Sequence, residues 1–316
     1  MNSFFLNLPP VPQKNTITYN SKIVLFGSCF VENIGQKLEY YKLQTSINPF
    51  GISYHPEAML NIIKRISEQK SFTESDLFFH NEQWHCFEVH SKLSNSNRNV
   101  VLKNLNQLLL QTKKELLEAT HIVLTFGTAW GYSIENKTVA NCHKIPQNEF
   151  EKVLTDAETL HNCFNEIFQV LKKDDPQLQI ITTISPVRHI KDGIIENNQS
   201  KSHLLTALHK IIANLNFVAY YPAYEIVIDC LREYRFYKED LVHPNQTAID
   251  FIWQHFIATY LYEPKTKAIL NKVAEIQKGL QHKPFNEQSE AHQKFVLSLR
   301  EKIETLKAEF QFMDFN

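Results

Sequence analysis

The stretch that decides the fold is residues 22–30, with the sequence KIVLFGSCF. Its apolar residues Ile23–Phe26 predict a buried β-strand, and the glycine that follows predicts a tight turn. Beyond the turn, apolar side chains recur at helical spacing, at Phe30, Ile34 and Leu38. A strand that passes through one turn directly into a helix predicts an α/β fold.

The same alternation of strand and helix recurs along the chain. Between the expected strands lie helical patterns, which we place at 56–70, 99–120, 149–172, 200–214, 223–233 and 247–261. Repeated β–α units predict a mostly parallel, five-stranded sheet with helices on both faces. The expected strands are Ile23–Phe26, Leu43–Ile47, Ile122–Phe126, Gln179–Ile184 and Phe217–Tyr221.

The domain organisation follows from changes in composition. Residues 1–262 form the predicted α/β domain, with an aromatic and polar insertion near 72–98 that interrupts the alternation. Residues 263–316 become charged and helical, with helices expected over 267–281 and 289–310. We interpret this C-terminal helical extension as a packing element or as the contact through which a homo-oligomer forms.

Composition excludes several classes of partner. Lys+Arg 33 against Asp+Glu 34 gives a net charge of -1, which offers no basic field for nucleic acid or for an anionic membrane. No run of 18 apolar residues and no secretory signal are found, so we expect a cytoplasmic protein without membrane insertion. The 5 cysteines are scattered, without the spacing of a metal site. We therefore expect no metal and no cofactor.

Ser28 has two interpretations. It follows a strand and begins a helix, where free backbone N–H groups favour negative charge, as a nucleophile requires. Serine is equally a favoured N-cap residue. Cys29 beside it is a second candidate nucleophile, since a helix start lowers the pKa of a thiol. Adjacent residues at a turn point in different directions, and we interpret Cys29 as a small packed hydrophobic residue.

A second motif lies far along the chain, at Asp240 and His243. An i, i+3 spacing can bring the carboxylate beside the histidine in a loop or a helical turn. Asp240 would then hold one ring nitrogen of His243, leaving the other to take a proton from Ser28. Together with the turn after the first strand, this pair predicts a catalytic unit.

Other polar and glycine residues gather where the predicted strands end. Gly27, Gly51 and Gly127 each follow a strand, and Arg188 and His189 follow the fourth. Ligands of parallel sheets bind beyond these carboxyl ends. We therefore predict that Arg188 and His189 contact the substrate. Arg188 would hold a carboxylate or phosphate, or else pair with an acidic residue at the sheet edge.

These blocks resemble a known family. The segment GSCFV at 27–31 resembles the signature of the GSCFA family, and blocks at 48–55, 139–144, 185–189 and 234–240 are similar to that family in order. The GSCFA family is similar to the SGNH (GDSL-like) hydrolases. The resemblance implies a flavodoxin-like, three-layer α/β/α fold and a Ser–Asp–His unit acting on ester bonds.

The resemblance also assigns residues, with one departure. It implies Ser28 as nucleophile, Asp240 and His243 as its partners, and the backbone N–H groups of Ser28 and Gly51 as the oxyanion hole. The third block of the SGNH pattern carries an asparagine donor, but this chain has Ala129 at that position. We place Asn141 or His143 in the missing role.

The predicted function is therefore that of a serine esterase. Its substrate is expected to be a small-molecule or carbohydrate ester from which a small acyl group, such as acetyl, is removed. One alternative is an O-acyltransferase that uses the same residues. Another is a catalytically silent module that binds carbohydrate or serves its biosynthesis, which the missing asparagine donor favours.

Overall fold

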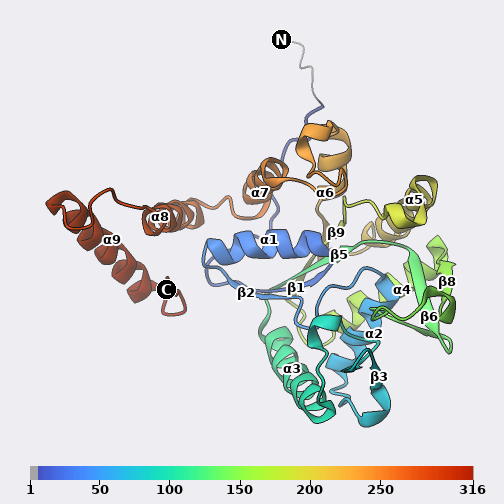
Figure 1. Ribbon diagram of the computed structural model, residues 1–316. Coiled ribbons are helices and arrows are strands. Elements are labelled where there is room, and N and C mark those ends of the chain that lie inside the picture. The colour runs from blue at the N-terminus through green and yellow to red at the C-terminus, as the bar shows by residue number, and fades with distance from the viewer. Residues whose placement is uncertain (1–5, 316) are drawn as a thin grey trace.

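A five-stranded parallel sheet forms the centre of the computed structural model, which describes residues 6–315 (Figure 1). All five predicted strands are confirmed, with ends that move by at most one residue. The sheet order is β10-β9-β5-β1-β2, and every neighbouring pair is parallel. The strands are β1 (Lys22–Gly27), β2 (Gln44–Ile47), β5 (His121–Phe126), β9 (Gln179–Ile184) and β10 (Val218–Tyr220).

This order has the flavodoxin-like pattern 2-1-3-4-5, with β5, β9 and β10 as its third, fourth and fifth strands. The chain first moves from β1 to β2 and then returns to the other side of β1 to form β5. The order of the strands therefore reverses between β1 and β5. In open α/β sheets, ligands bind beyond the carboxyl ends of the strands at such a reversal.

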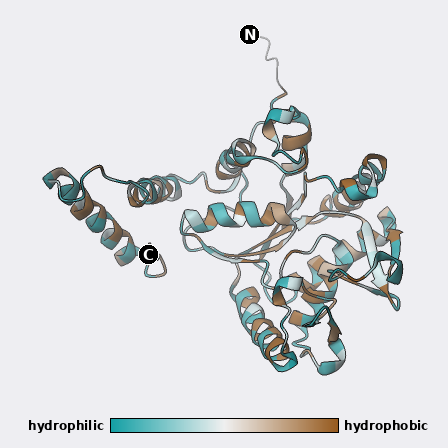
Figure 2. Cartoon of the chain, viewed as in Figure 1, coloured by the Kyte–Doolittle hydropathy of each residue, from teal (hydrophilic) through white to brown (hydrophobic). Residues whose placement is uncertain are grey.

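Helices cover both faces of the sheet, which confirms the predicted three-layer fold. Along β1, Val24 and Phe26 face one hydrophobic core, and Ile23 and Leu25 face the other. The first core packs against α2 (Pro56–Ser67), α3 (Arg98–Glu118), α4 (Ala157–Lys172) and α5 (Ile194–Ile212). The second packs against α1 (Cys29–Tyr40), α6 (Ala223–Glu225) and α7 (Gln246–Tyr260). Figure 2 shows hydrophobic residues along the central strands.

Three predicted helices have other bounds in the structure, and one of them, expected over 200–214, begins at Ile194. The helix expected over 149–172 begins only at Ala157, after the N-cap Asp156, because Glu151–Leu154 pairs as β8 with β6 (Trp130–Ile134). Strand β7 (Lys137–Thr138) completes this antiparallel sheet. The helix expected over 223–233 ends at Cys230. Its second part, Ile226–Cys230, is a π-helix.

The segment predicted as an insertion contains a short hairpin of β3 (Phe78–His80) and β4 (Gln83–His85). Arg65 on α2 fastens this segment to the domain. Its guanidinium contacts Glu88 at 2.5 and 2.7 Å and Asp76 at 3.1 Å, and donates to the carbonyls of residues 70 and 71. Only 5% of the Arg65 side chain is exposed.

Beyond the α/β domain lie α8 (Pro264–Leu280) and α9 (Glu290–Glu309), which extend away from the sheet in Figure 1. The chain after α9 returns to the second core, where Phe310 packs on Tyr19 with ring centroids 5.4 Å apart. The domain boundary at 262 and the homo-oligomer remain predictions.

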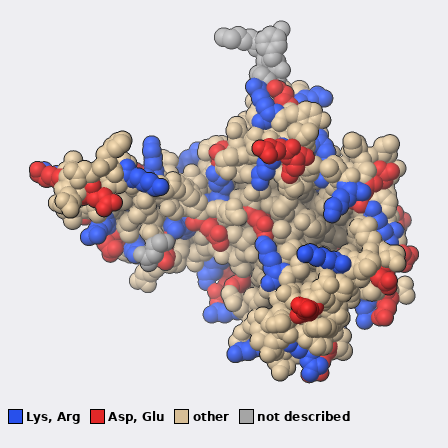
Figure 3. All heavy atoms as spheres, in the orientation of Figure 1, with Lys and Arg blue, Asp and Glu red and all other residues tan. Residues whose placement is uncertain are grey.

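The surface drawn in Figure 3 carries basic and acidic side chains interspersed. None of the helices between residues 6 and 315 is long and apolar enough to cross a membrane. The prediction that the chain lacks a secretory signal falls partly on residues 1–5, which lie outside the described residues.

Replacing Arg65 with methionine is expected to lower the free energy of unfolding by about 3 kcal/mol, because Glu88 and Asp76 lose their buried partner. The matched control is Arg98→Met, which breaks the exposed pair with Glu74 and is expected to cost less than about 1 kcal/mol. Urea unfolding of both variants measures the difference. Equal losses would contradict the role given to Arg65.

Candidate active site

A cavity of about 580 Å³ lies beyond the carboxyl ends of the central strands. Segments that follow β1, β5 and β9 contribute to it, and so does the loop before α7. It therefore lies at the edge of the sheet where the strand order reverses. Its wall includes Cys29, Tyr54, Thr128, Ser185, Arg188, His189, Asp240 and His243.

Asp240 and His243 form the hydrogen-bonded pair that their spacing predicts. The Oδ2 atom of Asp240 lies 2.7 Å from Nδ1 of His243. Its Oδ1 accepts the backbone N–H groups of Val242 and His243, both at 2.9 Å. These three bonds hold the pKa of Asp240 down at about 2, so the carboxylate stays ionised at neutral pH.

Backbone hydrogen bonds close the hairpin that carries this pair. The N–H of Lys238 donates to the carbonyl of His243, and Leu241 between them has a φ of 58°. Both members of the pair remain accessible, with 48% of the Asp240 side chain and 41% of the His243 side chain exposed. With Nδ1 directed to the carboxylate, Nε2 of His243 is left for proton transfer.

Ser28 and Cys29 occupy different environments. Ser28 is the N-cap of α1, its Oγ accepts the N–H of Phe30 at 3.3 Å, and it is 1% exposed. Cys29 is the first helical residue, is half-buried and lines the cavity. The structure therefore brings Cys29, and not Ser28, to the wall that holds His243. The sequence does contain a signal for this difference. Ser28 is a favoured N-cap residue, and the side chain of an N-cap residue folds back onto its own helix.

The predicted oxyanion donors do not line the cavity. The N–H of Gly51 donates to the carbonyl of Asn48 at 2.7 Å, within a turn. Asn141 accepts the N–H of His143 through its side chain. The ring of His143 lies 2.8 Å, through Nε2, from the carbonyl of Cys86 in the aromatic cluster of the insertion. Gly51 and Asn141 are thus bonded within their own turns, and His143 is bonded to the insertion.

Arg188 and His189 both line the cavity, as predicted. The Nη1 atom of Arg188 donates to the hydroxyl of Tyr237 at 3.2 Å, and its guanidinium lies 5.4 Å from the centre of that ring. No carboxylate pairs with Arg188 within residues 6–315, so its charge is left for an anionic group. Burial lowers the pKa of His189 to about 4, so this ring is neutral at pH 7.

A buried lysine supports the floor of the site. The Nζ atom of Lys201 on α5 donates to the carbonyls of Gly127 at 2.5 Å and Ser185 at 2.7 Å, which follow β5 and β9. Burial lowers its pKa to about 7. Lys201 was not predicted from the sequence, although it lies on the same helical face as the buried residues Leu204 and Leu208.

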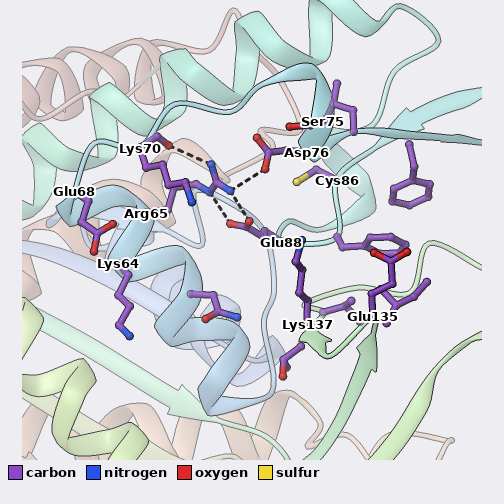
Figure 4. Close-up of a pocket in the computed structure, with 17 residues that line it drawn as sticks. Lys64, Arg65, Glu68, Lys70, Ser75, Asp76, Cys86, Glu88, Glu135 and Lys137 are labelled. Atoms are coloured by element: carbon purple, nitrogen blue, oxygen red, sulfur yellow. Dashed lines mark hydrogen bonds and ion pairs between the residues drawn. The ribbon is translucent and has the colours of Figure 1, made fainter.

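A second cavity, of about 490 Å³, lies between α2 and the insertion (Figure 4). Its central charge, Arg65, is directed at Asp76 and Glu88, and the three groups satisfy one another. Burial raises the pKa of Cys86 on its wall to about 12, which disfavours a reactive thiolate.

Within the part of the chain that the structure describes, no group of three His, Cys, Asp or Glu residues could hold a metal ion.

The chain belongs to the GSCFA family, whose sequence profile matches residues 22–256. The profile of the GSCFA domain protein, C-terminal domain, matches residues 273–316, which include the C-terminal part of α8 and all of α9. The family match spans the turn after β1, the Asp240–His243 hairpin and most of α7. A search of the curated proteins gave no match.

Several solved structures show a distant likeness. A Streptococcus pneumonia protein, provisionally described as a platelet activating factor, has 13% identity over 75% of this chain and 82% of that chain, with a TM-score of 0.40. A carbohydrate esterase family 3 protein from Talaromyces cellulolyticus has 7% identity over 79% of this chain and 98% of that chain, with a TM-score of 0.38. A mutant acetyl esterase with acetate ion has 8% identity over 80% of this chain and 99% of that chain, with a TM-score of 0.38. Similarities this low carry no argument about the reaction.

Two histidines on the cavity wall, the buried His55 and the half-buried His189, predict a stability that depends on pH. Burial lowers the pKa of His55 and of His189 from 6.5 to about 4. Between these values the unfolded chain binds more protons, so the free energy of unfolding falls as the pH falls from 6.5 to 4. Urea midpoints at about pH 7 and about pH 4.5 measure this loss. His55→Gln is expected to reduce the difference between the two midpoints, and an undiminished difference would contradict the assignment.

Proposed function

We propose that the chain is an ester hydrolase in which His243, oriented by Asp240, is the general base. The nucleophile comes from the turn between β1 and α1. The observation that carries the proposal is the bond of 2.7 Å between Asp240 and His243 on the wall of the cavity at the sheet edge. A carboxylate that holds Nδ1 fixes the tautomer whose Nε2 can accept a proton.

In the proposed reaction, the nucleophile attacks the ester carbonyl while His243 takes its proton. The protonated ring then donates to the leaving alcohol, and water releases the acyl group. The sequence predicts Ser28 as the nucleophile, and the position of Cys29 on the same wall as His243 makes it the second candidate. A cavity of about 580 Å³ is large enough for a small acyl group on a sugar-sized alcohol.

Two alternatives keep the same cavity. An O-acyltransferase would pass the acyl group to a sugar hydroxyl in place of water, and product analysis with a sugar acceptor separates transfer from hydrolysis. A silent binding module is favoured by one observation: the N–H of Gly51 is occupied by Asn48, and Ala129 supplies no side-chain donor. Each missing donor costs about 10²–10³ in rate.

His243→Ala is expected to lower kcat/KM for p-nitrophenyl acetate by roughly 10⁴-fold, because the nucleophile loses its base. Asp240→Asn, which leaves the ring without its ionic partner, is expected to cost about 10³-fold or more. Turnover is measured by release of p-nitrophenolate, with His282→Ala as the control outside the cavity. Activity of His243→Ala within a few-fold of wild type would contradict the proposal.

Arg188 is expected to bind an anionic group on the substrate. Arg188→Gln should raise KM about tenfold or more for an ester that carries a carboxylate, since a hydrogen bond to a charged group contributes about 1.5–3 kcal/mol. For neutral p-nitrophenyl acetate the change should be much smaller. The measurement compares KM for p-nitrophenyl hemisuccinate and p-nitrophenyl acetate, and an equal change for both would exclude this role.

A further inference from the structure

The polar groups of Ser28 are engaged inside the protein. Its Oγ accepts from Phe30, its N–H donates to the carbonyl of Thr125 at 3.3 Å, and its carbonyl accepts from Val31 at 2.9 Å. The residue is 1% exposed. For Ser28 to attack a substrate, its side chain would have to leave the cap and become accessible.

Cys29 needs no such rearrangement. Cys29 is the first residue of α1 and lines the cavity together with Tyr54, Asp240 and His243. Burial raises the pKa of Tyr54 on the same cavity, and a charge on Cys29 would raise it further. A second thiol, Cys142, lines the same cavity but belongs to the loop that follows β7, away from any helix start.

We propose that Sγ of Cys29, and not Oγ of Ser28, attacks the ester carbonyl. This inference rests on the proposed function. As the S–C bond forms, the S–H proton passes to Nε2 of His243 and the carbonyl π electrons move to oxygen. Collapse of this intermediate breaks the C–O bond, and the alcohol leaves with the proton from His243. Water, activated by the same ring, then hydrolyses the thioester and restores the thiol.

The charges around Cys29 explain why a base is needed. Burial raises the pKa of the Cys29 thiol and Glu32 raises it further, while Lys201 and Lys238 lower it. The resting residue is therefore a protonated thiol, which attacks only when its proton is taken. Lys201, held under the cavity by two carbonyl bonds, and the first turn of α1 both favour the negative charge that develops during the attack.

The test compares Cys29→Ala with Ser28→Gly in the full chain, using p-nitrophenyl acetate. Cys29→Ala is expected to lose at least about 10³-fold in kcat/KM. Ser28→Gly is expected to stay within tenfold of wild type, because glycine substitutes for serine at an N-cap with little loss. Cys230→Ala, which removes a half-buried thiol outside the cavity, is the matched control.

The site of acylation is determined on the wild-type protein, so this measurement does not depend on the folding of a variant. The protein is quenched in acid during turnover and the peptide that contains both residues is isolated. An acetyl group that neutral hydroxylamine removes is a thioester on Cys29, and supports the inference. An acetyl group that resists hydroxylamine is an oxygen ester on Ser28, and overturns it.

The outcomes separate this inference from the proposed function. If Ser28→Gly loses turnover and Cys29→Ala keeps it, Cys29 is not the nucleophile, while esterase activity and the role of His243 still stand. If His243→Ala keeps the wild-type rate, the proposed function fails, whichever residue carries the acetyl group.

Discussion

The close approach of β1 to β5 at Gly27 is the constraint on which the site depends. A Cβ atom at Gly27 would lie 2.3 Å from the carbonyl oxygen of Thr125, and its φ is +145°, so a side chain cannot be accommodated. The N–H of Gly27 donates to Oδ1 of Asn48 at 2.8 Å, and its carbonyl accepts from Ser53 at 3.1 Å. One residue thus fixes the end of β1, the loop after β2 and the direction in which the chain enters α1.

Lys201 has a corresponding role beneath the cavity. Its two bonds join the segments that follow β5 and β9, which carry Thr128, Arg188 and His189 to the wall. A buried cation is costly, and the lowered pKa of Lys201 reflects that cost. The wall of the site therefore rests on the rigid edge of the sheet, whereas the Asp240–His243 pair is supplied by a separate, exposed hairpin.

The features that the sequence predicted correctly are those encoded by local patterns. Runs of apolar residues marked all five central strands, and an i, i+3 spacing was sufficient to pair Asp240 with His243. Strand β8 was missed because its strand form depends on pairing with β6, which lies earlier in the chain beyond β7 and a loop. The orientation of Ser28 and Cys29 depends on whether the helix begins at one residue or the next, which is finer than periodicity resolves.

Ala129 stands at the position where the SGNH pattern has an asparagine donor, so negative charge in this cavity needs another stabilising group. The N–H of Ala129 donates to Oγ of Ser200 at 2.7 Å, and Ala129 is fully buried, so this position is committed to packing against α5. The cavity instead has the guanidinium of Arg188 on its wall and Lys201 beneath it. The charge of Arg188, and that of Lys201 when it is protonated, act on a developing negative charge over a longer range than a neutral amide does. The cavity lacks one amide donor, but these two basic residues still give it a means of stabilising negative charge.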